Sequence, residues 1–394
     1  MSFTVEAFAA DSASAFAAGS QPAALQVSLR QLPEAQWERS IGEFAGVCQE
    51  QLATFAAIRW PGVTREPILF AAGGRVVGGS LMLIQKLPLG LGAIAVAKWG
   101  PMLAEADRPD ALAVYAGMIE ALVARYARER RMMLSVMPHA SLASRNPEFE
   151  HLVARGFRPG AKLGFPNRYI VNLRLSDDEQ RKSLEQKWRY HLNKSEKAGL
   201  SFEHAGAGRL GEFDALYEAM TDRKKFRDYS AYGTIPALMA MENPLLRPEL
   251  FFVRHAGEAV AGAIIFKAGH RAVYLYGATT VKALGLRAGY FLHWHVIRWL
   301  RENTRAGWYD LGGTDGFQGL HQFKKGMVGS AGVISPLPAV ANYAAYKLPF
   351  AMGEAAFAAR ELVHAGQRLV DRLRSNRATP DQARPGRQQP DREP

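Results

Sequence analysis

Two segments far apart in this chain carry the same β-hairpin pattern. In residues 68–83 apolar runs flank Gly73-Gly74, and in residues 250–266 similar runs flank Ala256-Gly257. A glycine-containing pair between two β-rich runs is typical of a tight hairpin turn. When Gly74 is placed on Gly257, Val77 falls on Val260, Gly79 on Gly262 and Leu81 on Ile264. The chain therefore repeats one hairpin.

The segments that follow each hairpin also match in kind. The first hairpin is followed by an expected strand over 93–99, an amphipathic helix over 110–130 and a strand over 132–137. After the second come an expected strand over 272–276, a helix over 289–303 and a strand over 308–311. A repeat of this length favours two copies of one mixed α/β domain, because a solenoid needs shorter and more numerous units.

The chain has 394 residues, which agrees with two domains. We place their boundary near Pro166, after the turn-rich residues 155–160. The predicted order is a flexible start (1–24), a first domain (25–165), a second domain carrying the main site (166–348), an amphipathic helix (349–374) and a disordered basic tail (375–394).

Net charge narrows the choice of partners. The formal charge is +12 and the pI is about 9.8, which favours anions such as tRNA, nucleotide pyrophosphates or the inner membrane surface. The single cysteine, Cys48, excludes an intramolecular disulfide. No signal-peptide pattern and no membrane-spanning apolar stretch occurs, so we expect a cytoplasmic protein, either free or in peripheral contact with the membrane.

The last third of the chain contains the most specific site pattern. The expected strand ends in Asp310-Leu311-Gly312-Gly313, and a glycine-spaced loop from Gly319 to Gly326 bears Lys324 and Lys325. Glycines 312 and 313 permit close approach of a ligand to the backbone. Asp310 either orients Lys324 or an accepting amine, or else caps the turn. The lysines are either site residues or a solvated pair.

Further candidate binding residues lie upstream. The segment 185–199 is basic, and Arg189, Asn193 and Lys197 share one helix face that suits phosphates; a solvated face is the alternative. A second basic cluster holds Arg223, and Tyr276 ends a strand in small residues that would line a substrate site.

These segments resemble the FemAB-type peptidyltransferases, bacterial enzymes that pass amino acids from aminoacyl-tRNA to peptidoglycan precursors. The family loop reads roughly Gly-Leu-x-x-Phe-Lys-x-Gly-Phe, matched here by Gly319, Leu320, Phe323, Lys324 and Gly326, with Met327 in the last aromatic place. The family's basic helix is matched by Arg189, Lys194, Lys197 and Gly199.

The resemblance implies two tandem GNAT-like domains and an aminoacyltransferase with Lys324 at its reaction centre. Its donor would be aminoacyl-tRNA and its acceptor an amine of a UDP-linked or lipid-linked precursor, without a metal or other cofactor. An ammonium fixed near the developing oxyanion stabilises such a transfer. We expect direct transfer, with the amine proton passing to a substrate carboxylate or to Asp310. Phe323, Lys325, Gly312 and Gly313 would complete the site.

Two alternatives remain open. One is an acyl-CoA-dependent N-acyltransferase acting on an amino sugar, polysaccharide or lipid precursor. Residues 282–289 hold only part of a pyrophosphate loop, with Arg287 in a position that normally holds a small residue, although Arg287 could itself bind phosphate. The other is a non-catalytic module that binds tRNA or lipid. No metal-site, Walker or nucleophile-elbow pattern occurs.

Overall fold

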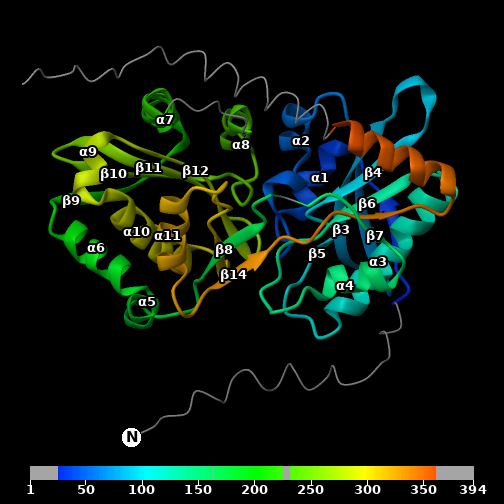
Figure 1. Ribbon diagram of the computed structural model, residues 1–394, viewed down its shortest axis with the longest axis horizontal. Helices are drawn as coiled ribbons and strands as arrows, with labels where there is room; N and C mark the ends of the chain where they lie inside the picture. The colour runs from blue at the N-terminus through cyan, green and yellow to red at the C-terminus, as the bar shows by residue number, and fades with distance from the viewer. Residues whose placement is uncertain (1–24, 163, 225–230, 361–394) are drawn as a thin grey trace, which may run out of the picture.

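The structure is a computed structural model that describes residues 25–162, 164–224 and 231–360. Two mixed β-sheets lie side by side, each flanked by helices (Figure 1). The first sheet has the order β1 (Ser28–Gln31), β2 (Thr64–Ala72), β3 (Arg75–Lys86), β4 (Ala93–Lys98), β6 (Met133–Met137), β15 (Ala341–Tyr343) and β7 (Arg158–Pro159), and β5 (Met102–Leu103) pairs with β3. The second has the order β14 (Val333–Pro336), β8 (Asn167–Asn172), β13 (Trp308–Asp310), β12 (Arg271–Thr279), β11 (Glu258–Phe266), β10 (Glu249–His255) and β9 (Leu200–Ala205).

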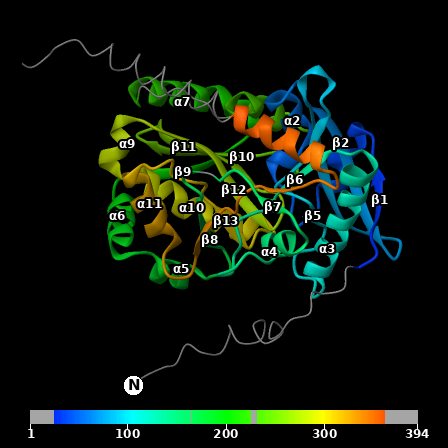
Figure 2. The same cartoon turned by 45° about the vertical axis from the view of Figure 1, so that its right-hand side comes forward.

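Helices pack on both sheets, as the two views show (Figures 1 and 2). The first half contains α1 (Glu34–Ile41), α2 (Ala53–Arg59), α3 (Ala111–Leu122, continued as π-helix to Glu129) and α4 (Pro147–Ala154). The second half contains α5 (Asp177–Ser183), α6 (Gln186–Glu196), α7 (Leu210–Lys224), α8 (Ile235–Met239), α9 (Val281–Leu286), α10 (Ala288–Asn303) and α11 (Gln318–Val328). Residues 347–360 form a further helix.

The predicted fold class, a mixed α/β chain with a duplicated unit, is confirmed. In both hairpins, β2–β3 and β10–β11, the two turn residues have positive φ: 54° and 79° at Gly73 and Gly74, and 50° and 83° at Ala256 and Gly257. Such turns twist in the same sense as the strands they join. In each sheet the hairpin pairs antiparallel with a third strand, which then pairs parallel with a fourth.

The two repeats exchange one strand each. β8, which follows the first repeat in the chain, lies in the second sheet beside β13. β15, which follows the second repeat, lies in the first sheet beside β6. Each occupies the same position, next to the parallel strand of the other repeat. The range predicted for the second domain, 166–348, thus includes a strand of the first sheet.

One apolar core crosses from the first half to the second. It joins Trp37 and Phe55 of the first half to Phe213 and Phe252 of the second, and all four side chains are buried. The halves therefore share a continuous interior.

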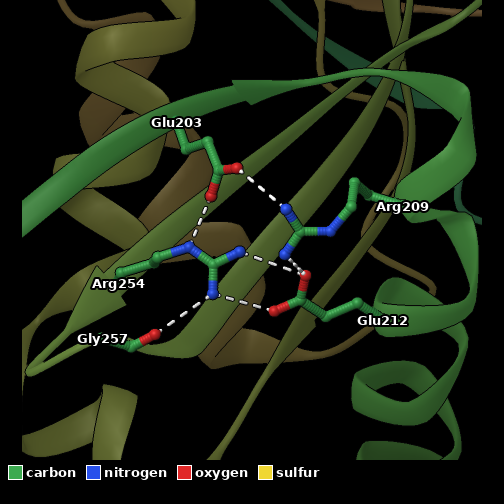
Figure 3. A network of polar contacts seen from close by, with 5 residues as sticks. All are labelled: Glu203, Arg209, Glu212, Arg254 and Gly257. Carbon is green, nitrogen blue, oxygen red and sulfur yellow. Dashed lines mark hydrogen bonds and ion pairs between the residues drawn. The ribbon is translucent and has the colours of Figure 1, made fainter.

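A charged network stiffens the outer edge of the second sheet (Figure 3). Arg254 donates to Glu203 and makes a two-bond contact with Glu212 at 2.9 and 3.1 Å, while Arg209 bonds to both carboxylates. These bonds tie β9 and β10 to the first turn of α7.

Three sequence-based expectations need comment. The segment 319–326, predicted as a loop, is helical, which corrects that prediction. The helix expected over 110–130 changes at Val123 from α to π geometry. Within the predicted helix 349–374, residues up to 360 are helical, whereas 361–374, the start 1–24 and the tail 375–394 lie outside the described residues.

Candidate active site

In the second sheet the two parallel strands, β12 and β13, diverge after a short paired stretch, and we call the gap between them the fork. β12 and β13 pair at only three positions, the last being Val273 with Asp310. β12 continues to Thr279, whereas the chain leaves β13 through Gly312, whose φ of +77° strongly favours glycine. In the first repeat the equivalent strands pair at five positions, from Ile94–Met133 to Lys98–Met137, and stay closed. The parallel strands therefore separate after fewer paired positions in the second repeat than in the first.

Lys324 projects from α11 to the apex of this fork. Its Nζ donates to the carbonyls of Leu311 and Gly313, both at 2.5 Å, and the side chain is buried. Burial, aided by the positive charge of Arg168, lowers the pKa of Lys324 to about 8. The two carbonyls use two N–H groups, so the protonated amine retains a third donor.

Close helix packing explains a glycine in the lysine-bearing segment. A Cβ at Gly326 would lie 3.0 Å from Cδ1 of Trp188 in α6, and the Glu185 amide donates to the Gly326 carbonyl at 3.0 Å. Glycine at this position thus lets α11 approach α6 closely. This close packing fixes the position of Lys324 relative to the strands β12 and β13.

Asp310 is held by an arginine from the exchanged strand β8. Arg168 Nε lies 3.1 Å from both carboxylate oxygens, and the Gly312 amide donates to Oδ1 at 2.9 Å. Burial alone would raise the pKa of Asp310, but the charges of Arg168 and Arg271 together with the Gly312 amide lower it. Asp310 therefore caps the turn and fixes Arg168, and it is a poor proton acceptor.

The fork faces a cavity of about 340 Å³ built from both halves of the chain. The second half supplies Arg168, Tyr274, Tyr276 and Lys324. From the first half come Gln49, Glu50 and Phe55.

A second cavity, of about 410 Å³, shares Arg168 and Glu50 with the first and is lined mostly by apolar side chains. Arg271 lies there and donates through both Nη atoms to the Ala140 carbonyl at 3.1 Å. Burial raises the pKa of Glu148 to about 7 and lowers that of His139 to about 3, so the imidazole is neutral.

Not all of the predicted site residues lie near the fork. Asp310, Gly312, Gly313, Tyr276 and Lys324 do, and Phe323 packs beside it against Trp188, Tyr290 and His293. Lys325 points away and pairs with Glu185 at 3.6 Å.

The predicted phosphate-binding residues are dispersed. Arg189 donates to the carbonyls of Lys182 and Leu184, which gives it a role in joining α5 to α6. Lys194 on α6 and Lys197 at its C-cap are both exposed. Arg223 donates to the Thr279 carbonyl at 3.0 Å, and Arg287 starts α10 with a φ of 58°.

Sequence reasoning missed Arg168, Arg271 and Glu50. Arg168 and Arg271 are lone cations at the ends of apolar strands, a signal that was present in the sequence. Glu50 follows Cys48 and Gln49 in an irregular segment, where no local pattern marks it.

Comparison with known proteins defines the class. Residues 180–325 match the family model of the acetyltransferase (GNAT) domain. The chain therefore carries a GNAT domain and is an acyltransferase. A search of curated protein sequences finds no match.

A solved structure shares the fold. The crystal structure of FemX superposes with a TM-score of 0.64 at 18% identity, covering 80% of this chain and 97% of FemX. The expected likeness to the FemAB type is thus confirmed in the fold. The C-terminal domain of a putative lysylphosphatidylglycerol synthetase from Agrobacterium fabrum has a TM-score of 0.47 at 14% identity, covering 82% and 96% of the two chains. A tandem GNAT protein of clavulanic acid biosynthesis has a TM-score of 0.41 at 14% identity, covering 80% and 97%.

Across the described residues, no group of three or more His, Cys, Asp and Glu side chains could hold a metal ion. No helix within the same ranges is long and apolar enough to cross a membrane.

Proposed function

We propose that this acyltransferase moves an aminoacyl group from aminoacyl-tRNA to an amine of a peptidoglycan precursor. The observation that carries the proposal is the buried Lys324 at the apex of an open strand fork, facing a cavity built from both halves. The motif around Lys324 resembles the FemAB type, and FemX shares the fold.

The geometry supports direct transfer. The attacking amine would add to the ester carbonyl, and the third N–H of protonated Lys324 would donate to the oxygen that becomes negative. The C–N bond forms in this addition. Collapse of the tetrahedral intermediate would then break the ester C–O bond, and a proton lost by the amine nitrogen would complete the released ribose hydroxyl. Loss of one such donor typically costs about 10²–10³ in rate. Asp310 serves this step by holding Arg168 and the turn, and the low pKa of its carboxyl argues against the role of proton acceptor.

The local structure argues against a CoA donor. Residues 281–286, where a pyrophosphate loop would lie, are coiled into α9, and the Arg287 amide is bonded to the Ala283 and Leu284 carbonyls. One observation favours the acyl-CoA alternative: among the described residues, Arg287 has a buried Nε without a hydrogen-bond partner. A phosphate near the start of α10 would satisfy it.

A two-donor assay tests the proposal. Purified protein receives labelled total aminoacyl-tRNA or labelled acetyl-CoA, each with a peptidoglycan precursor and a general amine. We expect transfer from the tRNA pool, its loss in Lys324→Met, and normal transfer in the matched variant Lys182→Met, which removes an exposed lysine. Near-normal transfer by Lys324→Met would refute the assigned role, and transfer from acetyl-CoA alone would refute the donor.

A further inference from the structure

A carboxylate from the first repeat stands in the reaction cavity of the second. Glu50 lies in the 3-10 turn Gln49–Gln51 and lines both cavities. It is half-buried, and across the described part of the chain no hydrogen bond or ion pair engages its carboxylate. By contrast, the nearby Asp310 carboxylate is fully committed to Arg168 and Gly312.

The turn that carries Glu50 is firmly anchored. The neighbouring Gln51 is fully buried, and its side chain accepts from the Leu81 amide at 2.7 Å and donates to the Lys98 carbonyl. Its own carbonyl accepts from Trp37 Nε1 at 2.7 Å. Every one of these bonds joins the turn to the rest of the first repeat. The backbone of Glu50 is therefore held rigidly, as a binding or catalytic side chain requires.

Side chains of opposite charge line this cavity without pairing. Arg168, Lys324 and Glu50 all line it, and among the described residues no ion pair within 4.0 Å joins Glu50 to either cation. Asp310 is the main cause of the raised pKa of the Arg168 guanidinium, and the charge of Glu50 adds to it, so Glu50 acts on Arg168 without contact. A cavity that is lined by an unpaired carboxylate and by two cations fits a ligand with a cationic end and an oxygen-rich end.

We propose that Glu50 binds the acceptor amine as its ammonium ion and then accepts a proton from it. This inference deepens the proposed function and rests on it for the second step. The ammonium gives one proton to Glu50, and its nitrogen lone pair forms the bond to the acyl carbon. The ester C–O bond then breaks, the nitrogen gives its second proton to the departing oxygen, and Glu50 returns the first proton to solvent. Each repeat thus supplies one side of the reaction: Glu50 from the first, Lys324 from the second.

Binding and transfer are measured separately. For binding, saturation-transfer NMR compares n-butylamine, which is a cation at pH 7, with 1-butanol, a neutral molecule of equal chain length. The unaltered protein should prefer the amine by at least about tenfold, as a carboxylate partner implies. Glu50→Gln should lose that preference, whereas Glu43→Gln, which removes an exposed carboxylate from the same segment, should keep it. The proposal is overturned if Glu50→Gln keeps the same preference for n-butylamine over 1-butanol as the unaltered protein. It is also overturned if the unaltered protein shows no such preference.

For transfer, Glu50→Gln should lower kcat by about 10²–10⁴, the range for loss of a general base. Glu50→Asp should recover part of this loss, and Glu43→Gln should stay within about twofold of the parent. An unchanged kcat in Glu50→Gln, or a loss confined to protein with altered circular dichroism, overturns the catalytic step. If the unaltered protein transfers from neither donor, the proposed function is refuted. The comparison of n-butylamine with 1-butanol would then still show whether Glu50 binds an ammonium ion.

Discussion

Burial of Lys324 should appear as a pH dependence of folding. The folded pKa is about 8 and the ordinary value is 10.5. Between these values the unfolded chain binds a proton that the folded chain does not, so stability rises with pH through this interval. Below this pH interval the folded protein carries Lys324 as a buried ammonium, which costs free energy of desolvation. Above the interval the amine is neutral in both states, and this cost is absent.

The size of the effect follows from the two pKa values. Lys324 alone should raise the free energy of unfolding by about 1.3 kcal/mol between pH 7 and pH 9. Lys324→Met removes this group and leaves the other titrating groups in place. The difference in unfolding free energy, parent minus variant, should therefore grow by the same amount over this range.

Urea unfolding at pH 7, 8 and 9 measures this difference, provided that both proteins keep the same m value. If the difference stays constant within about 0.3 kcal/mol, the folded and unfolded chains bind protons equally at Lys324, and the amine is not desolvated by folding. A difference that falls as the pH rises would contradict the sign of the predicted pKa shift.

Three further perturbations test the surrounding structure. Asp310→Asn leaves the Arg168 charge buried without its partner and should lower the unfolding free energy by about 3–5 kcal/mol; a loss under about 1 kcal/mol in urea would contradict the buried pair. Gly326→Val should force α11 away from Trp188 and abolish transfer while far-UV circular dichroism stays near normal, and full activity would refute the close-packing argument. Arg254→Met breaks the network of Figure 3 and should cost about 1–2 kcal/mol, less at high salt; salt-independent stability loss would point to packing instead.

The sequence predicted the repeated hairpins and the strands and long helices that follow them because these depend on local signals. Turn glycines and alternating apolar residues mark the hairpins, and apolar residues at helical spacing mark the long helices. The lysine segment was predicted as a loop because Gly319 and Gly326 disfavour a helix. Packing reverses this preference, since Gly326 allows α11 to contact α6.

Local sequence patterns could not predict which polar side chains pair in the site. Arg168 and Asp310 are separated by 142 positions in the chain, and their pairing depends on β8 lying next to β13. Glu50 belongs to the other repeat. Periodicity identifies a strand but not its neighbour in the sheet, so the exchange of β8 and β15 left no signal in the pattern.

That exchange has a consequence for how such a chain arises and comes apart. A single repeat on its own would lack an internal strand of its sheet, and two separate copies would complete each other only by interlocking. The protein is thus organised like a strand-swapped homodimer whose subunits have been fused. Scission of the connection between β7 and β8 should therefore yield two fragments that remain associated, neither of which is a complete domain alone.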